Sequence, residues 1–205
     1  MITIIDYGLG NIRAFANIYQ RLNIEFQIAK KKEDIYHAQK LILPGVGAFD
    51  NAINLLNSSG MRDIIEKKVI EEQIPVLGVC VGMQIMANTS DEGNLQGLGW
   101  FNAEVRVFDV KKINFKPHIP HMGWNSIIPV KDNLIFTELK PDSRFYFLHS
   151  YYFECKEKSN ELSVTNYGIN FTSSVVKNNI YGFQFHPEKS HNNGILVLKN
   201  FATLI

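Results

Sequence analysis

Along the first 80 residues, short continuous apolar runs are separated by stretches in which apolar residues recur every three or four positions. This pattern predicts strands separated by helices. Short apolar runs of strand length cover residues 1–6, 24–29, 40–43 and 74–79. Between them, apolar side chains recur at helical spacing, which predicts helices over residues 11–22, 48–56 and 61–73. Strands that alternate with helices are typical of a mostly parallel sheet with helices on both faces.

The pattern changes after residue 103, where strand-like segments follow one another with only turns between them. These segments are residues 104–108, 144–148, 151–155, 162–167, 171–176 and 180–185. Their spacing predicts antiparallel or mixed pairing, and a last helix is expected over residues 193–204. We therefore predict an α/β fold with additional antiparallel strands in its second half.

Composition narrows the class of protein. The 205 residues are 45% hydrophobic, enough for one full core, so we expect a single domain over residues 1–205. The 21 basic and 20 acidic residues leave a formal charge of +1, which favours no nucleic acid partner. No apolar run reaches the roughly 18 residues of a membrane span, and Asp6 interrupts the apolar amino terminus, so a cytoplasmic protein without membrane contact is expected. Two cysteines in unrelated contexts suit a reducing compartment.

The segment GVCVG, residues 78–82, predicts a nucleophile. Cys80 stands where the apolar run 74–79 turns into a helical pattern, and Gly78 and Gly82 flank it at two residues on either side. Such a tight strand-to-helix turn exposes a nucleophile and needs small neighbours. The helix amino terminus favours the thiolate.

The segment QFHPEKS supplies the partners for this thiol. His186 and Glu188 are two residues apart after a strand-like stretch, and in an extended chain their side chains point the same way. We assign His186 as the base and Glu188 as the group that orients it. A lone buried cysteine or histidine usually belongs to the core, but the combination favours catalysis.

Other motifs are weaker. The GLG that follows the first strand lacks the third glycine of a dinucleotide site, whose position holds Arg13, so no nucleotide cofactor is predicted. His118 and His121 lack the further ligands of a zinc site, so no metal is predicted. The loop LPGVGAF, residues 43–49, ends a strand at the sheet edge where ligands bind. It is therefore either an ordinary turn or an oxyanion hole, together with the N–H of Val81.

Taken in order, GVCVGMQ, LPGVGAF, HMGWN, HSYYF and QFHPEKS resemble the motifs of class I (triad) glutamine amidotransferases over the whole chain. PGVG and PHMGWN are most similar to glutaminase subunits of imidazole glycerol phosphate synthases. The resemblance implies a flavodoxin-like sheet, L-glutamine as substrate, no cofactor, and a heterodimer with a (β/α)₈-barrel cyclase that receives ammonia.

The resemblance also implies residue roles. The oxyanion donors would be the backbone of Val46, Gly47 and Val81. Glutamine would contact Gly47, Gln84, Glu92 and the backbone of His149, Ser150 and Tyr151. Asn11, Trp124 and Lys189 would contact the barrel, although Trp124 is alternatively a core aromatic.

Three further functions remain open at this level. A paralogue of the same build would feed ammonia to a sugar amidotransferase in surface polysaccharide synthesis. A non-catalytic module on the same fold would not need Cys80, His186 and Glu188 together. A cysteine peptidase would share the triad without explaining HMGWN.

Overall fold

A computed structural model describes residues 1–114, 116 and 118–205. A long mixed sheet forms its centre, with the strand order β2-β1-β3-β4-β13-β12-β10-β6-β5, and β11 and β8 join beside β12. The strands are β1 (Ile2–Ile5), β2 (Phe26–Ala29), β3 (Lys40–Gly45), β4 (Val76–Cys80), β5 (Thr89–Ser90), β6 (Ala103–Val107), β8 (Ile128–Pro129), β10 (Tyr151–Cys155), β11 (Glu161–Tyr167), β12 (Ile169–Lys177) and β13 (Ile180–Phe183).

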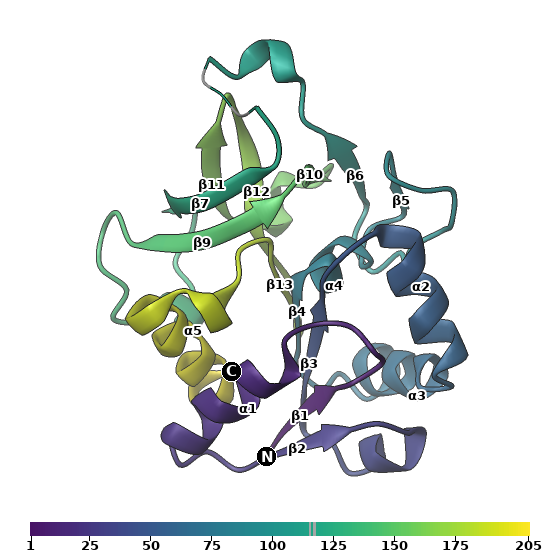
Figure 1. Cartoon of the computed structure of the whole chain (residues 1–205). Helices are drawn as coiled ribbons and strands as arrows, with labels where there is room; N and C mark the ends of the chain where they lie inside the picture. The colour runs from purple at the N-terminus through teal and green to yellow at the C-terminus, as the bar shows by residue number, and fades with distance from the viewer. Residues whose placement is uncertain (115, 117) are drawn as a thin grey trace.

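The first half of the chain forms the parallel part of this sheet. β1, β2, β3, β4 and β13 pair in parallel. The side chains of these strands are largely buried because helices cover both faces, except on the edge strand β2. Figure 1 shows α1 and α5 on one side of these strands and α2 and α3 on the other. The helices are α1 (Ile12–Arg21), α2 (Phe49–Ser58), α3 (Arg62–Glu66), α4 (Val81–Gln84) and α5 (His191–Leu204). The predicted α/β class is confirmed.

The second half extends the sheet with antiparallel strands. β12 pairs antiparallel with β13, β10 and β11, and β10 pairs antiparallel with β6. A separate two-stranded sheet joins β7 (His121–Ser126) to β9 (Arg144–His149), and Figure 1 shows it above α5, beside the carboxyl ends of the parallel strands. The prediction of antiparallel strands in this half is also confirmed.

The structure differs from the sequence prediction in local details. β5, β7 and β8 were not predicted, and the helix expected over residues 61–73 is α-helical only to Glu66 and then continues as a π-helical turn, Lys67–Glu71. No helix in the described part of the chain is long and apolar enough to cross a membrane.

Candidate active site

Cys80 occupies a strained turn between β4 and α4. Its backbone has φ 55° and ψ −114°, a region that a residue with a side chain rarely adopts. The elbow packs directly on β3, because a Cβ added at Gly82 would lie 1.9 Å from the carbonyl oxygen of Leu43. A Cβ at Gly78 would lie 2.6 Å from the carbonyl oxygen of Gly82. Both glycines are therefore needed for close packing, as the sequence predicts.

The helix after the elbow is shorter than the pattern indicated. α4 is a single turn, Val81–Gln84, followed by a tighter turn in which the N–H of Met86 donates to the carbonyl oxygen of Met83. One turn carries little macrodipole, so the helix contributes less to a Cys80 thiolate than the sequence argument assumed. The first N–H groups of the turn, that of Val81 included, have no partner within a helix.

His186 and Glu188 meet through a turn and not through an extended strand. Pro187–Lys189 is a 3₁₀ turn, so the reasoning from alternating strand side chains was wrong. The predicted contact nevertheless forms, with His186 Nδ1 and Glu188 Oε1 2.9 Å apart and both side chains almost fully buried. Pro187 fixes its own φ at the first position of this turn, and the turn brings the Glu188 carboxylate to Nδ1 of the imidazole.

The charge state of His186 depends on its neighbours. Burial alone lowers its pKa, but the hydrogen bond and charge of Cys80, followed by those of Glu188, outweigh burial and raise the pKa to about 10. The imidazole is thus positively charged when the sulfur is a thiolate. Within the described part of the chain, the second carboxylate oxygen of Glu188 is buried without a hydrogen-bond partner. The arrangement suits an imidazolium–thiolate pair.

A pocket of about 490 Å³ opens over Cys80. It brings together, from five separate segments, most of the residues that the sequence pointed to. Those lining it are Val46, Gly47, Cys80, Val81, Gln84, Glu92, His149, Ser150, Tyr151, His186 and Lys189, and Ala48, Pro120 and Leu148 complete the wall. Its size suits a ligand as small as an amino acid.

The loop after β3 carries the backbone groups nearest the sheet edge. Gly47 has φ +94°, a conformation that glycine adopts freely, and Val46 is exposed. Tyr7 anchors the end of β3, just before this loop, by donating its hydroxyl to the carbonyl oxygen of Pro44 at 2.7 Å. A Cβ at Gly10 would lie 2.5 Å from Pro44 Cβ, so the GLG segment also packs on the end of β3.

Glu92 is held at the amino terminus of α2. Its Oε2 accepts the backbone N–H of Phe49 at 2.9 Å, which places a carboxylate where the helix favours negative charge. In return, Asp50 in the first turn of α2 accepts the N–H groups of Asn94 and Leu95 at 2.9 and 3.0 Å. The loop that carries Glu92 is therefore clamped to the helix that follows the PGVG loop.

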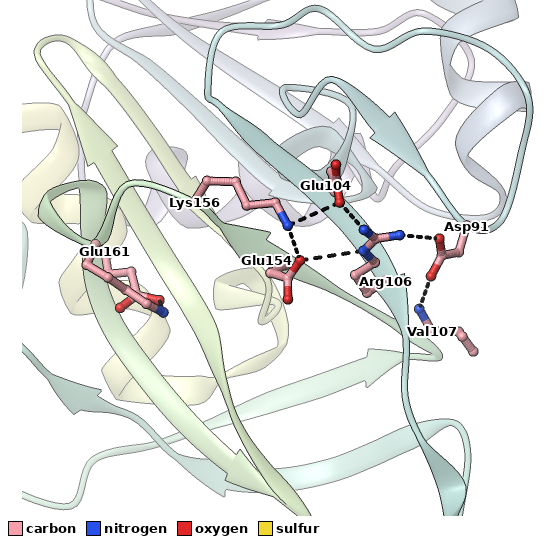
Figure 2. A network of polar contacts seen from close by, with 8 residues as sticks. Asp91, Glu104, Arg106, Val107, Glu154, Lys156 and Glu161 are labelled. Carbon is pink, nitrogen blue, oxygen red and sulfur yellow. Dashed lines mark hydrogen bonds and ion pairs between the residues drawn. The ribbon is translucent and has the colours of Figure 1, made fainter.

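A surface network fixes the other end of that loop (Figure 2). Asp91 binds the guanidinium of Arg106 at 3.0 Å and accepts the N–H of Val107 at 3.0 Å. Arg106 also pairs with Glu104 and with Glu154. Single exposed pairs stabilise little, but this network ties the loop to two neighbouring strands, β6 and β10.

A buried histidine chain, which the sequence analysis did not assign, supports the wall of the pocket. His149 Nδ1 lies 2.7 Å from the carbonyl oxygen of Tyr151, and His149 Nε2 lies 2.9 Å from His121 Nδ1. Asn125 Nδ2 lies 3.2 Å from His121 Nε2 and donates to the carbonyl oxygen of Asn166 at 2.9 Å. The carbonyl oxygens of Tyr151 and Asn166 can only accept, so His149 Nδ1 and Asn125 Nδ2 must donate to them. His149 Nε2 then accepts from His121 Nδ1, and His121 Nε2 accepts from Asn125, which leaves one proton on each ring and both rings neutral. The signal was the H and N of HMGWN.

Burial lowers the pKa of both rings. The pKa of His121 falls to about 4, and that of His149 falls well below its ordinary value through burial and then through its neighbour His121. Both ring nitrogens of His121 are engaged in hydrogen bonds, with His149 and with Asn125.

Across the residues that the structure describes, no group of three or more His, Cys, Asp or Glu could hold a metal ion.

The residues expected at a partner interface lie on the rim of the pocket or beside it. Trp124 is 38% exposed and stacks on His191 at 5.1 Å between ring centroids, so it is not a core aromatic. Lys189 lines the pocket and lies over the ring of Tyr146 at 5.8 Å. Asn11 is exposed at the start of α1, which packs against the 3₁₀ turn that carries Lys189.

Comparison with known proteins agrees with this geometry. A family model described as "Glutamine amidotransferase class-I" matches residues 3–204. The chain is 52% identical over 206 residues to imidazole glycerol phosphate synthase subunit HisH of Bdellovibrio bacteriovorus, and 48% identical over 204 residues to that of Leptospira borgpetersenii. Both matches cover 100% of each chain. A solved structure titled "Crystal structure of glutamine amidotransferase" superposes with a TM-score of 0.74 at 20% identity, covering 98% of both chains, and thus shares the fold. This chain belongs to the class I glutamine amidotransferase family.

Proposed function

We propose that this chain is the glutaminase subunit of an imidazole glycerol phosphate synthase in histidine biosynthesis. It would hydrolyse L-glutamine to L-glutamate and ammonia and pass the ammonia to a (β/α)₈-barrel cyclase partner. The observation that carries the proposal is the buried grouping of Cys80, His186 and Glu188, of which Cys80 and His186 line an amino-acid-sized pocket. Sequence identities of 48% and 52% to two HisH subunits over their full lengths support the assignment to histidine biosynthesis.

The first half of the reaction is acylation of the enzyme. The Cys80 thiolate attacks the side-chain carboxamide carbon of glutamine, forming a C–S bond and a tetrahedral oxyanion. Backbone N–H groups of Val81 and of the loop at Val46 and Gly47 would hold that oxyanion. The His186 imidazolium gives its proton to the departing nitrogen, the C–N bond breaks, and ammonia leaves from a γ-glutamyl thioester.

The second half regenerates the thiol. His186, now neutral, removes a proton from water, which attacks the thioester carbon, and glutamate leaves as the C–S bond breaks. Glu188 holds Nδ1 of the imidazole throughout, so that Nε2 faces the sulfur and the substrate. The Glu92 carboxylate would pair with the α-ammonium of glutamine, and the backbone of His149, Ser150 and Tyr151 would line the opposite wall.

The reaction site lies next to the surface that would meet the cyclase. Ammonia attacks only while it is unprotonated, and in water near neutral pH it becomes mostly ammonium. Direct transfer into the partner would avoid that loss. Lys189 borders the pocket, and the exposed ring of Trp124 lies nearby, in contact with Tyr146 beneath Lys189. We therefore place Asn11, Trp124 and Lys189 at the cyclase interface.

The test uses Cys80→Ala in complex with the cyclase, with Cys155→Ala as the matched control. Cys80→Ala should abolish product formation from glutamine and leave synthesis from ammonium salts at high pH largely intact. Cys155→Ala should retain both activities. Loss of both activities in a folded Cys80→Ala complex would refute the channelling scheme. Labelling of Cys155 alone by a diazo-ketone analogue of glutamine, with loss of activity, would refute the nucleophile.

A further inference from the structure

Gln184 lies against the sulfur of Cys80. It has none of the catalytic or substrate-binding roles described so far. It follows β13 directly, its side chain is fully buried, and its backbone N–H donates to the carbonyl oxygen of Ser173 at 2.9 Å. Its Nε2 is 3.9 Å from Cys80 Sγ. Its Oε1 accepts from Gln84 Nε2 at 3.1 Å. Both ends of the side-chain amide are thus in contact with residues of the pocket.

The neighbouring groups determine which end of this amide faces the sulfur. Gln84 Nε2 also donates to the carbonyl oxygen of Tyr151 at 3.1 Å. A backbone carbonyl only accepts, so the nitrogen of Gln84 must face it, and its second hydrogen points to Gln184. Gln184 must then present its oxygen to Gln84 and its N–H to the sulfur. Donation therefore runs from Gln84 through Gln184 to the sulfur, and the other N–H of Gln84 donates to the Tyr151 carbonyl.

This orientation matters because it decides which charge state of the sulfur the amide favours. The carbonyl oxygen of Leu148 lies 3.9 Å from Sγ, and it can accept from a neutral thiol but repels a thiolate. A donor on the sulfur has the opposite effect, since hydrogen bonds to an ionised group favour that form. Gln184 and the charged His186 ring are two groups next to the sulfur that favour the thiolate.

We propose that Gln184 is a fourth member of the catalytic centre, which donates an N–H to Cys80 Sγ and stabilises the attacking thiolate. This inference rests on the proposed function, in which Cys80 is the nucleophile. A buried amide needs partners wherever it lies, so a purely structural role for Gln184 would show in stability alone. The two roles differ in what they predict for the reactivity of the sulfur.

The experiment measures alkylation of the isolated wild-type chain and its variants by iodoacetamide as a function of pH, with each cysteine followed by mass spectrometry. Gln184→Met keeps the length of the side chain and removes the donor. It should slow alkylation of Cys80 at neutral pH about tenfold and move the profile to higher pH. Gln184→Glu keeps an oxygen towards Gln84 and puts negative charge beside the sulfur, so it should slow alkylation further.

Two controls separate the role of this donor from general disruption. Asn200 is a buried amide of α5 that donates to the carbonyl oxygens of Ile135 and Thr137, so Asn200→Leu should lower the Tm and leave the Cys80 rate unchanged. Cys155 is an internal reference, because burial raises the pKa of its thiol. Wild-type rates in both Gln184 variants would overturn the proposal, whatever their stability.

A measurement on the wild-type chain needs no variant to fold. In NMR spectra, the side-chain amide resonances of Gln184 should shift with the same pH midpoint as Cys80 alkylation. Resonances that do not shift with pH would overturn the proposal. Failure of the proposed function looks different. If Cys80 of the wild-type chain reacts no faster than Cys155, the nucleophile assignment fails and this inference falls with it. If wild-type Cys80 is reactive and the Gln184 variants match it, only the role of Gln184 is refuted.

Discussion

The buried histidine pair predicts that the fold loses stability in mild acid. His121 and His149 are almost fully buried and hydrogen-bonded to one another, with His149 bound in turn to the Tyr151 carbonyl. An additional proton on His121 would point at the side-chain amide hydrogens of Asn125. The chain of hydrogen bonds is therefore satisfied only while both rings are neutral.

The sign and size of the effect follow from the pKa of His121, which burial lowers from an ordinary value of 6.5 to about 4. Above pH 6.5 the ring is neutral in the folded and the unfolded chain, so it makes no difference to stability. Between pH 6.5 and about 4 the unfolded chain binds the proton and the folded chain does not. Stability then falls by about 1.4 kcal/mol for each pH unit, or about 2 kcal/mol between pH 6.5 and 5. His149, whose pKa is also lowered by burial, adds to this loss.

Urea unfolding at pH 6.5 and pH 5 measures the effect. The variant His121→Asn keeps an N–H near the position of Nδ1, where it can donate to His149, and removes the titrating group. It should be less stable than the wild type at pH 6.5, because it loses ring contacts with Phe147 and Tyr167, but it should lose about 2 kcal/mol less between the two pH values. The exposed His37, changed to Asn, is the control for removal of a histidine. An equal acid loss in the wild type and His121→Asn would refute the reasoning.

Two further predictions concern the pocket itself. His186→Ala should remove nearly all glutaminase turnover of the complex with the cyclase, whereas Glu188→Gln should retain more, because an orienting group improves geometry without exchanging protons with the substrate. Equal turnover in the two variants would contradict these roles. Glu92→Gln should raise the KM for glutamine and, through its weaker bond to the N–H of Phe49, lower the stability by up to about 1 kcal/mol. An unchanged KM with lowered stability would reduce Glu92 to a helix cap.

Much of the architecture could be predicted because burial imposes a period on the sequence. The parallel strands are apolar on both faces, and α1 and α2 carry one apolar face each, so their positions were found to within a few residues. The elbow could be predicted for a different reason. Its two glycines leave no room for a Cβ, and that steric requirement is visible as a pattern of letters.

The remainder depends on contacts between distant segments. β7 was missed because its sequence, HMGWNS, contains Gly and Asn and is only partly buried, so neither strand propensity nor alternation marks it. His121 and Gln184 stand inside recognised motifs, but their partners lie 28 and 104 residues away in the sequence. No spacing rule connects such pairs. The contact of His186 with Glu188 was predicted correctly from a backbone conformation that the chain does not adopt.

The same limit applied to Trp124, for which the sequence left core packing and docking as alternatives, and the observed exposure now makes a prediction. Trp124 lies on β7, stacks on the exposed His191 ring, and contacts Tyr146, over which Lys189 extends at the rim of the pocket. Trp124→Ala should therefore fold, with a loss of about 1 kcal/mol or less, because exposed side chains contribute little to stability. As an aromatic beside the pocket, Trp124 should contribute about 2 kcal/mol to binding of the cyclase. Calorimetry should therefore show a roughly 30-fold higher Kd for Trp124→Ala than for the wild type. Tyr36→Ala, at an exposed aromatic between β2 and β3, is the matched control and should leave the Kd unchanged. A variant of Trp124 that unfolds, or that binds the cyclase as tightly as the wild type, would show that the stack with His191 serves this chain alone.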